Sequence, residues 1–252
     1  MRIVLSKIMS ILSIHKEPLV TIATIRRPDA MNAINFELMD RLETLLDQLE
    51  ADEDIRLFLL TGSENSFISG GDLKEFHQIK DAEGAKRMTL RMIRLLERIE
   101  NLPCWTLAAL NGDVYGGGWE MMLSFDFRVA RDDIKIGFTQ GKFYLPPGWG
   151  GITKLSRVLG REQALYWLAS NRVISSGEAL THGLIQEVFE SDQFENKLEE
   201  LTKELTRNDR TYIDYVKRKD LKSPSDEVNP FSHFWESEEH LKRVDRFLNR
   251  KK

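Results

Sequence analysis

The stretch Val114–Met122, VYGGGWEMM, places three glycines directly before a bulky ring and a carboxylate. Glycine has no Cβ, so a ligand can approach the backbone closely at Gly116, Gly117 and Gly118. Glu120 follows among apolar neighbours, where a carboxylate is costly unless hydrogen bonds satisfy it or chemistry uses it. The pattern therefore predicts a backbone binding site with one acid–base group directly behind it.

A second glycine loop has the same construction. The segment FISGGDL follows the apolar run IRLFLLTG, just as the glycine cluster follows the run CWTLAAL. In α/β folds, ligands gather where strands end and helices begin, because the backbone amides there lack partners and carry partial positive charge. Two such amides that converge on one point would form an oxyanion hole. Taken alone, each loop is more often a glycine turn that allows close packing.

The surrounding elements alternate between strands and helices through about residue 130. Continuous or β-branched apolar runs predict buried strands over residues 19–25, 55–62 and 104–110. Apolar side chains at helical spacing predict helices over residues 35–49, 82–101, 192–207, 210–221 and 231–250. Asp72 is placed to open a further helix. This order predicts an α/β core of right-handed βαβ units, followed by a mainly helical region.

The composition limits the classes of function. The chain has 252 residues, of which 41% are hydrophobic and 30% charged, a globular composition with an ample core. Its 36 basic and 40 acidic residues leave a net charge of −4, so no overall basic field is present to hold nucleic acid. The single cysteine, Cys104, excludes an internal disulfide and fits a reducing, cytoplasmic setting. No apolar run is long enough to span a membrane, and the scattered histidines lack the spacing of metal ligands.

Three segments together resemble the crotonase superfamily, the enoyl-CoA hydratase/isomerase group. They are FISGGDLKEF, NGDVYGGGWEMMLSFDFRVA and IGFTQGKFYLPPGWGGITKLSRVLG. Their combination and order are far more specific than any one glycine cluster. The resemblance implies a crotonase-like ββα spiral core over residues 1–190 that binds acyl-CoA. It also implies a helical C-terminal region over residues 191–252 that serves trimerisation and covers the active site.

The resemblance further implies an acyl-CoA thioester substrate, no metal, and no cofactor apart from the coenzyme A of the substrate. The amides of Gly71 and Gly117 would hold the thioester oxygen as it becomes an enolate oxyanion. The residues expected to contact the acyl group or CoA are Ala30, Gly70, Asp72, Leu73, Lys74 and Trp149. Lys74 and the basic tail NRKK could reach the CoA phosphates, although a solvated surface explains them equally well. Trp149, with Trp119, Phe143 and Tyr144, would make the acyl site short, although aromatic residues are as often plain core.

One position departs from the family pattern. Classical hydratases of the family use two glutamates, and Glu120 matches the one behind the glycine cluster. The other lies seven residues before the proline of the later PGxGG segment, which from Pro147 leads to Gln140. A carboxamide exchanges no proton at neutral pH, but it can donate a hydrogen bond or fix a water molecule. The predicted catalytic set is therefore Glu120, Gly71, Gly117 and Gln140.

This departure slightly favours a lyase that decarboxylates a short alkylmalonyl-type acyl-CoA. Hydration needs both an acid and a base, whereas loss of carbon dioxide generates the enolate by itself and needs one proton donor. GGGWEMMLSFD and PGWGG also look similar to segments of the methylmalonyl- and ethylmalonyl-CoA decarboxylases. Hydration or isomerisation of an enoyl-CoA with Glu120 is the alternative.

An alternative of another class is a non-catalytic family member that binds CoA or RNA, although the acidic balance argues against RNA. The resemblance implies a homotrimer or a dimer of trimers, with no membrane partner. The final helix has an apolar stripe that could pack on the protein's own core or on a neighbouring subunit.

Overall fold

The computed structural model describes residues 10–217 and 222–249. The start of the chain before residue 10, predicted to belong to the first strand or to precede it, lies outside the described residues, as does the basic tail after Asn249. The chain forms two compact units, Met1–Arg210 and Thr211–Lys252, and both glycine loops belong to the first. The predicted boundary at residue 190, between an acyl-CoA-binding core and a region that serves trimerisation and covers the active site, stays a prediction. No helix among the described residues has the length and apolarity needed to cross a bilayer.

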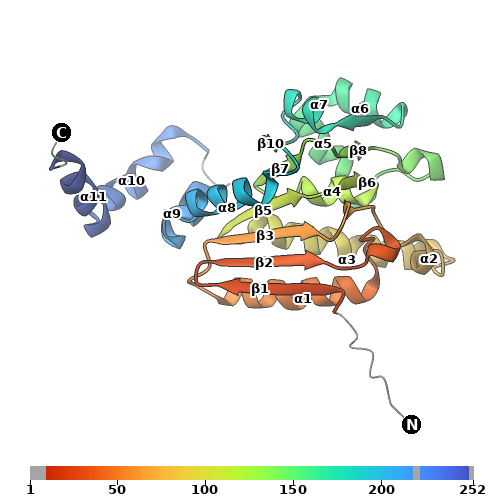
Figure 1. Cartoon of the computed structure of the whole chain (residues 1–252), viewed down its shortest axis with the longest axis horizontal. Helices are drawn as coiled ribbons and strands as arrows, with labels where there is room; N and C mark the ends of the chain where they lie inside the picture. Colours follow the sequence, from red (N-terminus) through yellow and green to blue (C-terminus); the bar gives the residue numbers. More distant parts are fainter. Residues whose placement is uncertain (1–9, 218–221, 250–252) are drawn as a thin grey trace, which may run out of the picture. The chain divides into compact units, whose positions relative to one another are not determined.

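The first unit is built on a six-stranded sheet with the order β1-β2-β3-β5-β7-β10 (Figure 1). Its strands are β1 (Leu12–Glu17), β2 (Val20–Ile25), β3 (Leu57–Gly62), β5 (Trp105–Leu110), β7 (Phe127–Arg131) and β10 (Glu187–Phe189). β1 runs antiparallel to β2, and all other neighbours are parallel. The three apolar runs of the sequence are β2, β3 and β5, and they lie side by side because such runs can be buried on both faces. The predicted α/β class is confirmed.

A second sheet of four short strands carries the glycine loops. Its strands, in the order of the sheet, are β4 (Ser66–Ile68), β6 (Asp113–Tyr115), β8 (Lys135–Gly137) and β9 (Val173–Ser175). β4, β6 and β8 are parallel, and β9 runs antiparallel to β8. β4 and β6 lie in the two segments that we predicted to be loops throughout. That prediction was wrong because a strand of three residues is too short to show an alternating apolar pattern.

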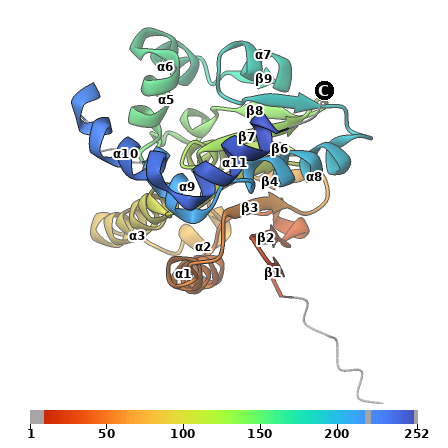
Figure 2. The same cartoon turned by 90° about the vertical axis from the view of Figure 1, so that its left-hand side faces the viewer.

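Helices follow the strands in a repeated order of long strand, short strand and helix. This unit occurs as β3–β4–α3, β5–β6–α4 and β7–β8–α5. The helices of the first unit are α1 (Phe36–Ala51), α2 (Leu73–Phe76), α3 (Ala82–Asn101), α4 (Gly117–Met122), α5 (Gly151–Leu159), α6 (Arg161–Ala169), α7 (Ser176–Thr181) and α8 (Phe194–Leu205), with the 3-10 turns η1 (Pro28–Ala30) and η2 (Gln140–Phe143). Figure 2 shows α1 and α3 next to each other, and α5, α6 and α7 gathered together at the end of the fold opposite β1.

The remaining helices are α9 (Arg210–Lys217), α10 (Val228–Glu236) and α11 (Glu238–Leu248), with the 3-10 turn η3 (Pro224–Glu227). We predicted a single helix over 231–250, but the structure breaks it at Ser237. The Ser237 hydroxyl accepts a hydrogen bond from the amide of His240 and so caps the start of α11.

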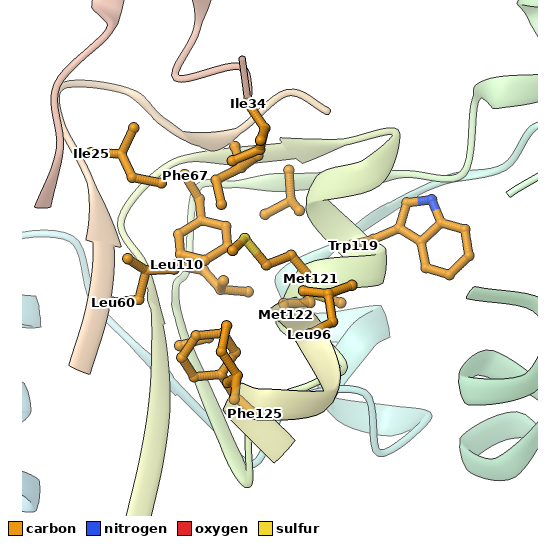
Figure 3. Packing of buried hydrophobic residues seen from close by; sticks show 14 of the residues in the cluster. Ile25, Ile34, Leu60, Phe67, Leu96, Leu110, Trp119, Met121, Met122 and Phe125 are labelled. Atoms are coloured by element: carbon orange, nitrogen blue, oxygen red, sulfur yellow. The ribbon is translucent and has the colours of Figure 1, made fainter. Parts of the chain in front are cut away.

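The hydrophobic core holds the short helix α4 in place. Met121 and Met122 of α4 are fully buried, and Figure 3 shows them directed toward Phe67 and Leu110 of the two sheets. The indole of Trp119, which belongs to the same core, extends from another side of the helix (Figure 3). Glu120 lies between Trp119 and Met121 in the sequence, so the buried side chains on both sides of it fix its position on the helix.

Asn32 ties the loop after β2 to the turn between β3 and β4. It is fully buried, with a φ of 55°, a left-handed conformation that asparagine tolerates better than most residues. Its Nδ2 donates to the carbonyls of Ser63 (3.0 Å) and Ser66 (2.6 Å), and its Oδ1 accepts the amide of Arg27 (2.9 Å). The carbonyl of Gly70 then accepts the amide of Ile34 at 2.8 Å, so the same loop also holds the first glycine loop.

We expect Asn32→Ala to lower the free energy of unfolding by about 2–4 kcal/mol, because it leaves buried backbone groups without partners. Urea denaturation measures this, with Asn196→Ala on the exposed face of α8 as the matched control. Equal stability of the two variants would contradict the role of Asn32.

Candidate active site

The two glycine loops meet at the ends of adjacent parallel strands. Ile68 of β4 pairs with Val114 of β6, so the chain leaves both strands on the same side. A Cβ on Gly70 would lie 3.0 Å from the amide nitrogen of Gly117, and a Cβ on Gly118 would lie 2.1 Å from the carbonyl oxygen of Ile68. The two backbones therefore touch directly, at positions where any side chain would separate them.

The amides of Gly71 and Gly117 point away from the hydrogen bonds of the fold. Gly71 forms a bridge with Ile34, but this bridge uses the carbonyl of Gly70 and the amide of Asp72, each at 2.8 Å. Alternate residues of an extended chain point to opposite sides, so the amide of Gly71 faces away from Ile34. Gly117 is the first residue of α4, where no acceptor exists within the helix. Within the described residues neither amide has a protein acceptor, and both are available to a ligand oxygen.

The Glu120 carboxylate is buried at the start of α5. The residue is 2% exposed. Its Oε1 accepts the amides of Trp149 (2.7 Å) and Gly151 (3.0 Å), and its Oε2 accepts Nε2 of Gln140 (3.1 Å). A Cβ on Gly151 would lie 2.7 Å from Oε1, so only glycine permits this approach. Two backbone amides therefore hold Oε1, and the Gln140 carboxamide holds Oε2.

Burial sets the acidity of this carboxyl group. Loss of solvation raises the pKa of Glu120 above its ordinary value of 4.5, because the charged form is penalised in a buried site. The hydrogen bonds from Trp149, Gly151, Gln140 and Gly148 act in the opposite direction but do not offset the burial. A carboxyl group with a raised pKa is better matched to proton transfer near neutral pH than an exposed one.

Trp149 lies against both glycine loops. It is nearly buried, and a Cβ on Gly117 would lie 2.1 Å from its Cζ3, while a Cβ on Gly71 would lie 3.5 Å from its Cζ2. The ring of Phe76 also flanks Gly71, whose Cβ would lie 2.6 Å from it. The two rings therefore lie beside the unpartnered amides.

The predicted CoA-contacting residues lie around the first glycine loop. Ala30 ends η1, and its carbonyl accepts the Ser69 hydroxyl at 3.3 Å. Leu73 and Lys74 are exposed on α2. In the part of the chain that the structure describes, none of these three residues hydrogen-bonds to Glu120 or Gln140, and their contacts with CoA remain predictions.

The Asp72 carboxylate is engaged within the fold. It accepts Arg27 Nη2 at 2.7 Å and caps α2 through the amides of Lys74 and Glu75. Burial by itself would raise the pKa of Asp72, but the Arg27 guanidinium and the capping amides outweigh it and hold that pKa below its ordinary value. In this structure Asp72 positions the loop, and a direct contact with CoA remains a prediction.

Phe143 and Tyr144, which we predicted to shorten the acyl site, are instead 62% and 98% exposed. Phe143 is the last residue of η2, which begins at Gln140, and Tyr144 comes directly after it with a left-handed φ of 58°. Trp119, predicted to line the same site, is fully buried and donates its Nε1 hydrogen to Oε1 of Gln140 at 3.0 Å. The pairing of Trp119 with Gln140, like the role of Gly151, depends on the fold and has no signal in the sequence.

The family model for enoyl-CoA hydratase/isomerase matches residues 16–238. The chain belongs to this family. It is 32% identical to the short-chain-enoyl-CoA hydratase of Clostridium acetobutylicum over 196 residues, which cover 77% of this chain and 75% of that protein. It is 34% identical to a probable enoyl-CoA hydratase of Bacillus subtilis over 177 residues, which cover 70% and 68%.

Solved structures of the family agree. An enoyl-CoA hydratase from Bacillus anthracis matches with a TM-score of 0.87 and 25% identity, covering 96% of this chain and 97% of its own. One from Thermoplasma volcanium matches with a TM-score of 0.85 and 26% identity, covering 96% and 98%. The predicted crotonase superfamily and its fold are confirmed. The names of these proteins favour hydration, so the comparisons do not support the predicted preference for decarboxylation.

The raised pKa of Glu120 predicts a pH-dependent stability. A group whose pKa is higher in the folded state contributes stability that is present below its unfolded pKa and is lost as the pH rises through its folded pKa. We therefore expect the free energy of unfolding of the wild type, relative to Glu120→Gln, to fall as the pH rises from about 4.5. Urea denaturation at a series of pH values measures it, with Glu97→Gln on exposed α3 as the control. A difference that does not change with pH would contradict the burial argument.

Proposed function

We propose that this protein is an acyl-CoA lyase that forms a thioester enolate between the amides of Gly71 and Gly117 and moves one proton at Cα with Glu120. The observation that carries the proposal is the pair of unpartnered amides on touching loops beside a buried carboxyl group. Donors fixed in advance stabilise charge that develops in the transition state, and removal of one such donor costs about 3–4 kcal/mol. The chemistry needs no cofactor beyond the CoA of the substrate.

The contacts of Glu120 favour a reaction that moves a single proton. Oε1 is saturated by two backbone amides, and Gln140 supplies a hydrogen bond but no proton. In decarboxylation of a short alkylmalonyl-CoA, the bond between Cα and the carboxylate carbon breaks, carbon dioxide leaves, and its electron pair forms the enolate. Protonated Glu120 then gives the proton of Oε2 to Cα and regains one from water. This is the reaction that the geometry supports best.

Hydration of a short enoyl-CoA is the second candidate, and the names of the relatives favour it. Water adds its oxygen to Cβ and loses a proton, while Cα gains one. Without a second carboxyl group, Oε2 of Glu120 must take the proton of the water and then protonate Cα from the same position. In either reaction the rings of Trp149 and Phe76 would lie beside the acyl group, which favours a short acyl chain.

The proposed assembly is a homotrimer or a dimer of trimers. Exposed apolar side chains on α10 and α11 support it, among them Phe231, Trp235, Phe247 and Leu248. The chain has a single cysteine, Cys104, which is buried and can form no disulfide within the chain, and this supports the proposed cytoplasmic setting.

We expect Glu120→Gln to lower kcat by a factor of about 10²–10⁴ on the best substrate of a panel of crotonyl-, 3-enoyl-, methylmalonyl- and ethylmalonyl-CoA. CoA binding, measured by calorimetry, should be retained, and Glu97→Gln should match the wild type. The pH profile then separates the two reactions. Decarboxylation needs protonated Glu120, so its rate should fall as the pH rises through the raised pKa, whereas hydration needs the carboxylate and should fall as the pH drops.

A wild type that binds CoA and turns over no thioester would instead support a non-catalytic binder. Full turnover by Glu120→Gln would contradict the role of this residue.

Gln140→Glu should shift the protein toward hydration. A second carboxyl group supplies the missing proton carrier, while its charge opposes binding of a malonyl carboxylate. We expect the ratio of crotonyl-CoA hydration to alkylmalonyl-CoA decarboxylation to rise at least about tenfold. Coupled spectrophotometric assays of both substrates measure this ratio. A proportional loss of both activities would show that Gln140 does not decide the reaction.

A further inference from the structure

Three side chains form a hydrogen-bonded series that ends at the acid–base group. Trp119 Nε1 donates to Gln140 Oε1 at 3.0 Å, and Gln140 Nε2 donates to Glu120 Oε2 at 3.1 Å. Trp119 and Glu120 are adjacent on α4, whereas Gln140 begins η2. The carboxamide of Gln140 thus bridges two neighbouring residues of one helix.

The indole determines which way this carboxamide faces. An indole N–H can only donate, so it requires the carbonyl oxygen of Gln140 and directs the NH₂ group toward Glu120. A reversed carboxamide would set its NH₂ group against the indole N–H, and the two donors would repel. It would also set its carbonyl oxygen against Oε2, a contact that is favourable only when Glu120 is protonated.

Packing holds the indole in place. Trp119 is fully buried, and its ring lies 5.0 Å from that of Phe138, which lies 5.2 Å from that of Trp167. A Cβ on Gly151 would lie 2.4 Å from Cη2 of Trp119. The indole N–H therefore has little freedom to follow a reversed carboxamide.

We propose that Trp119 is a positioning residue that prevents Gln140 from accepting the proton of Glu120 and so keeps that proton available to the substrate. Because both lone pairs of Oε1 are occupied, protonated Glu120 carries its proton on Oε2. A reversed Gln140 would bind this proton in an internal hydrogen bond and withhold it from Cα. The effect on turnover rests on the proposed function, while the effect on proton affinity does not.

The test removes the indole N–H but keeps an aromatic ring. In Trp119→Phe we expect the pKa of Glu120 to rise, because the released carboxamide can accept from the protonated acid. The measurement is a ¹³C NMR titration of the Glu120 carboxyl group, assigned by its absence in Glu120→Gln. In Gln140→Leu, Trp119→Phe should cause no further change, because no carboxamide is present. Trp167→Phe, which truncates the next indole of the same aromatic row, should leave the titration unchanged.

Turnover gives the second readout. Trp119→Phe should lower kcat by about tenfold or more with little change in KM, because the acid is withheld while the substrate still binds. The inference is overturned if Trp119→Phe leaves the Glu120 titration unchanged, or changes it equally with and without Gln140. NMR needs no turnover, so an inactive wild type with the expected titrations would refute only the proposed function.

A measurement on the wild type covers the case in which Trp119→Phe does not fold. Of the five indole ¹⁵N resonances, one should titrate together with Glu120, and its pH response should vanish in Gln140→Leu. If none of the five follows Glu120, the inference is also overturned.

Discussion

The site depends on one interaction, the double hydrogen bond from the amides of Trp149 and Gly151 to Oε1 of Glu120. A carboxyl group buried without partners would cost several kcal/mol of folding free energy, and these amides at the start of α5 offset much of that cost. The same contacts occupy one oxygen completely, which restricts proton exchange to the other. Gly151 must lack a side chain for the contact to form, and the ring of Trp149, whose backbone amide makes the other contact, lies against both glycine loops.

The repeated strand–strand–helix unit explains why the two glycine loops, Glu120 and the start of α5 lie close together. β4, β6 and β8 are parallel neighbours, so the loops after them open at one edge of the small sheet. The first loop provides Gly71 and the second Gly117 with Glu120. The third leads through Gln140 to Trp149 and Gly151. Each repeat therefore contributes a different part of one site: an amide, an amide with an acid, and the groups that orient the acid.

Much of this arrangement could be predicted from local patterns. The buried strands β2, β3 and β5 are continuous apolar runs, and Asn35 and Asp72 cap helices where their types suggest it. The family followed from three segments in order. The contacts that could not be predicted join residues that are distant in the chain. They are the ion pair of Asp72 with Arg27, the hydrogen bonds of Asn32 to the turn between β3 and β4, and the hydrogen bond of Trp119 to Gln140. The short strands β4 and β6 were missed because three residues are too few to show an alternating apolar pattern. The exposure of Tyr144 follows from its left-handed backbone conformation, which a tyrosine in the sequence does not indicate.

Enolate formation with a single proton carrier is what we propose, whichever reaction the protein completes. The most direct measurement is exchange of the α-hydrogens of butyryl-CoA in D₂O, followed by mass spectrometry and NMR. With Glu120 as the single proton carrier, as proposed, the wild type should replace one of the two α-hydrogens stereospecifically, and Glu120→Gln should replace neither. Exchange at the wild-type rate in Glu120→Gln, or replacement of both hydrogens at equal rates, would contradict the claim.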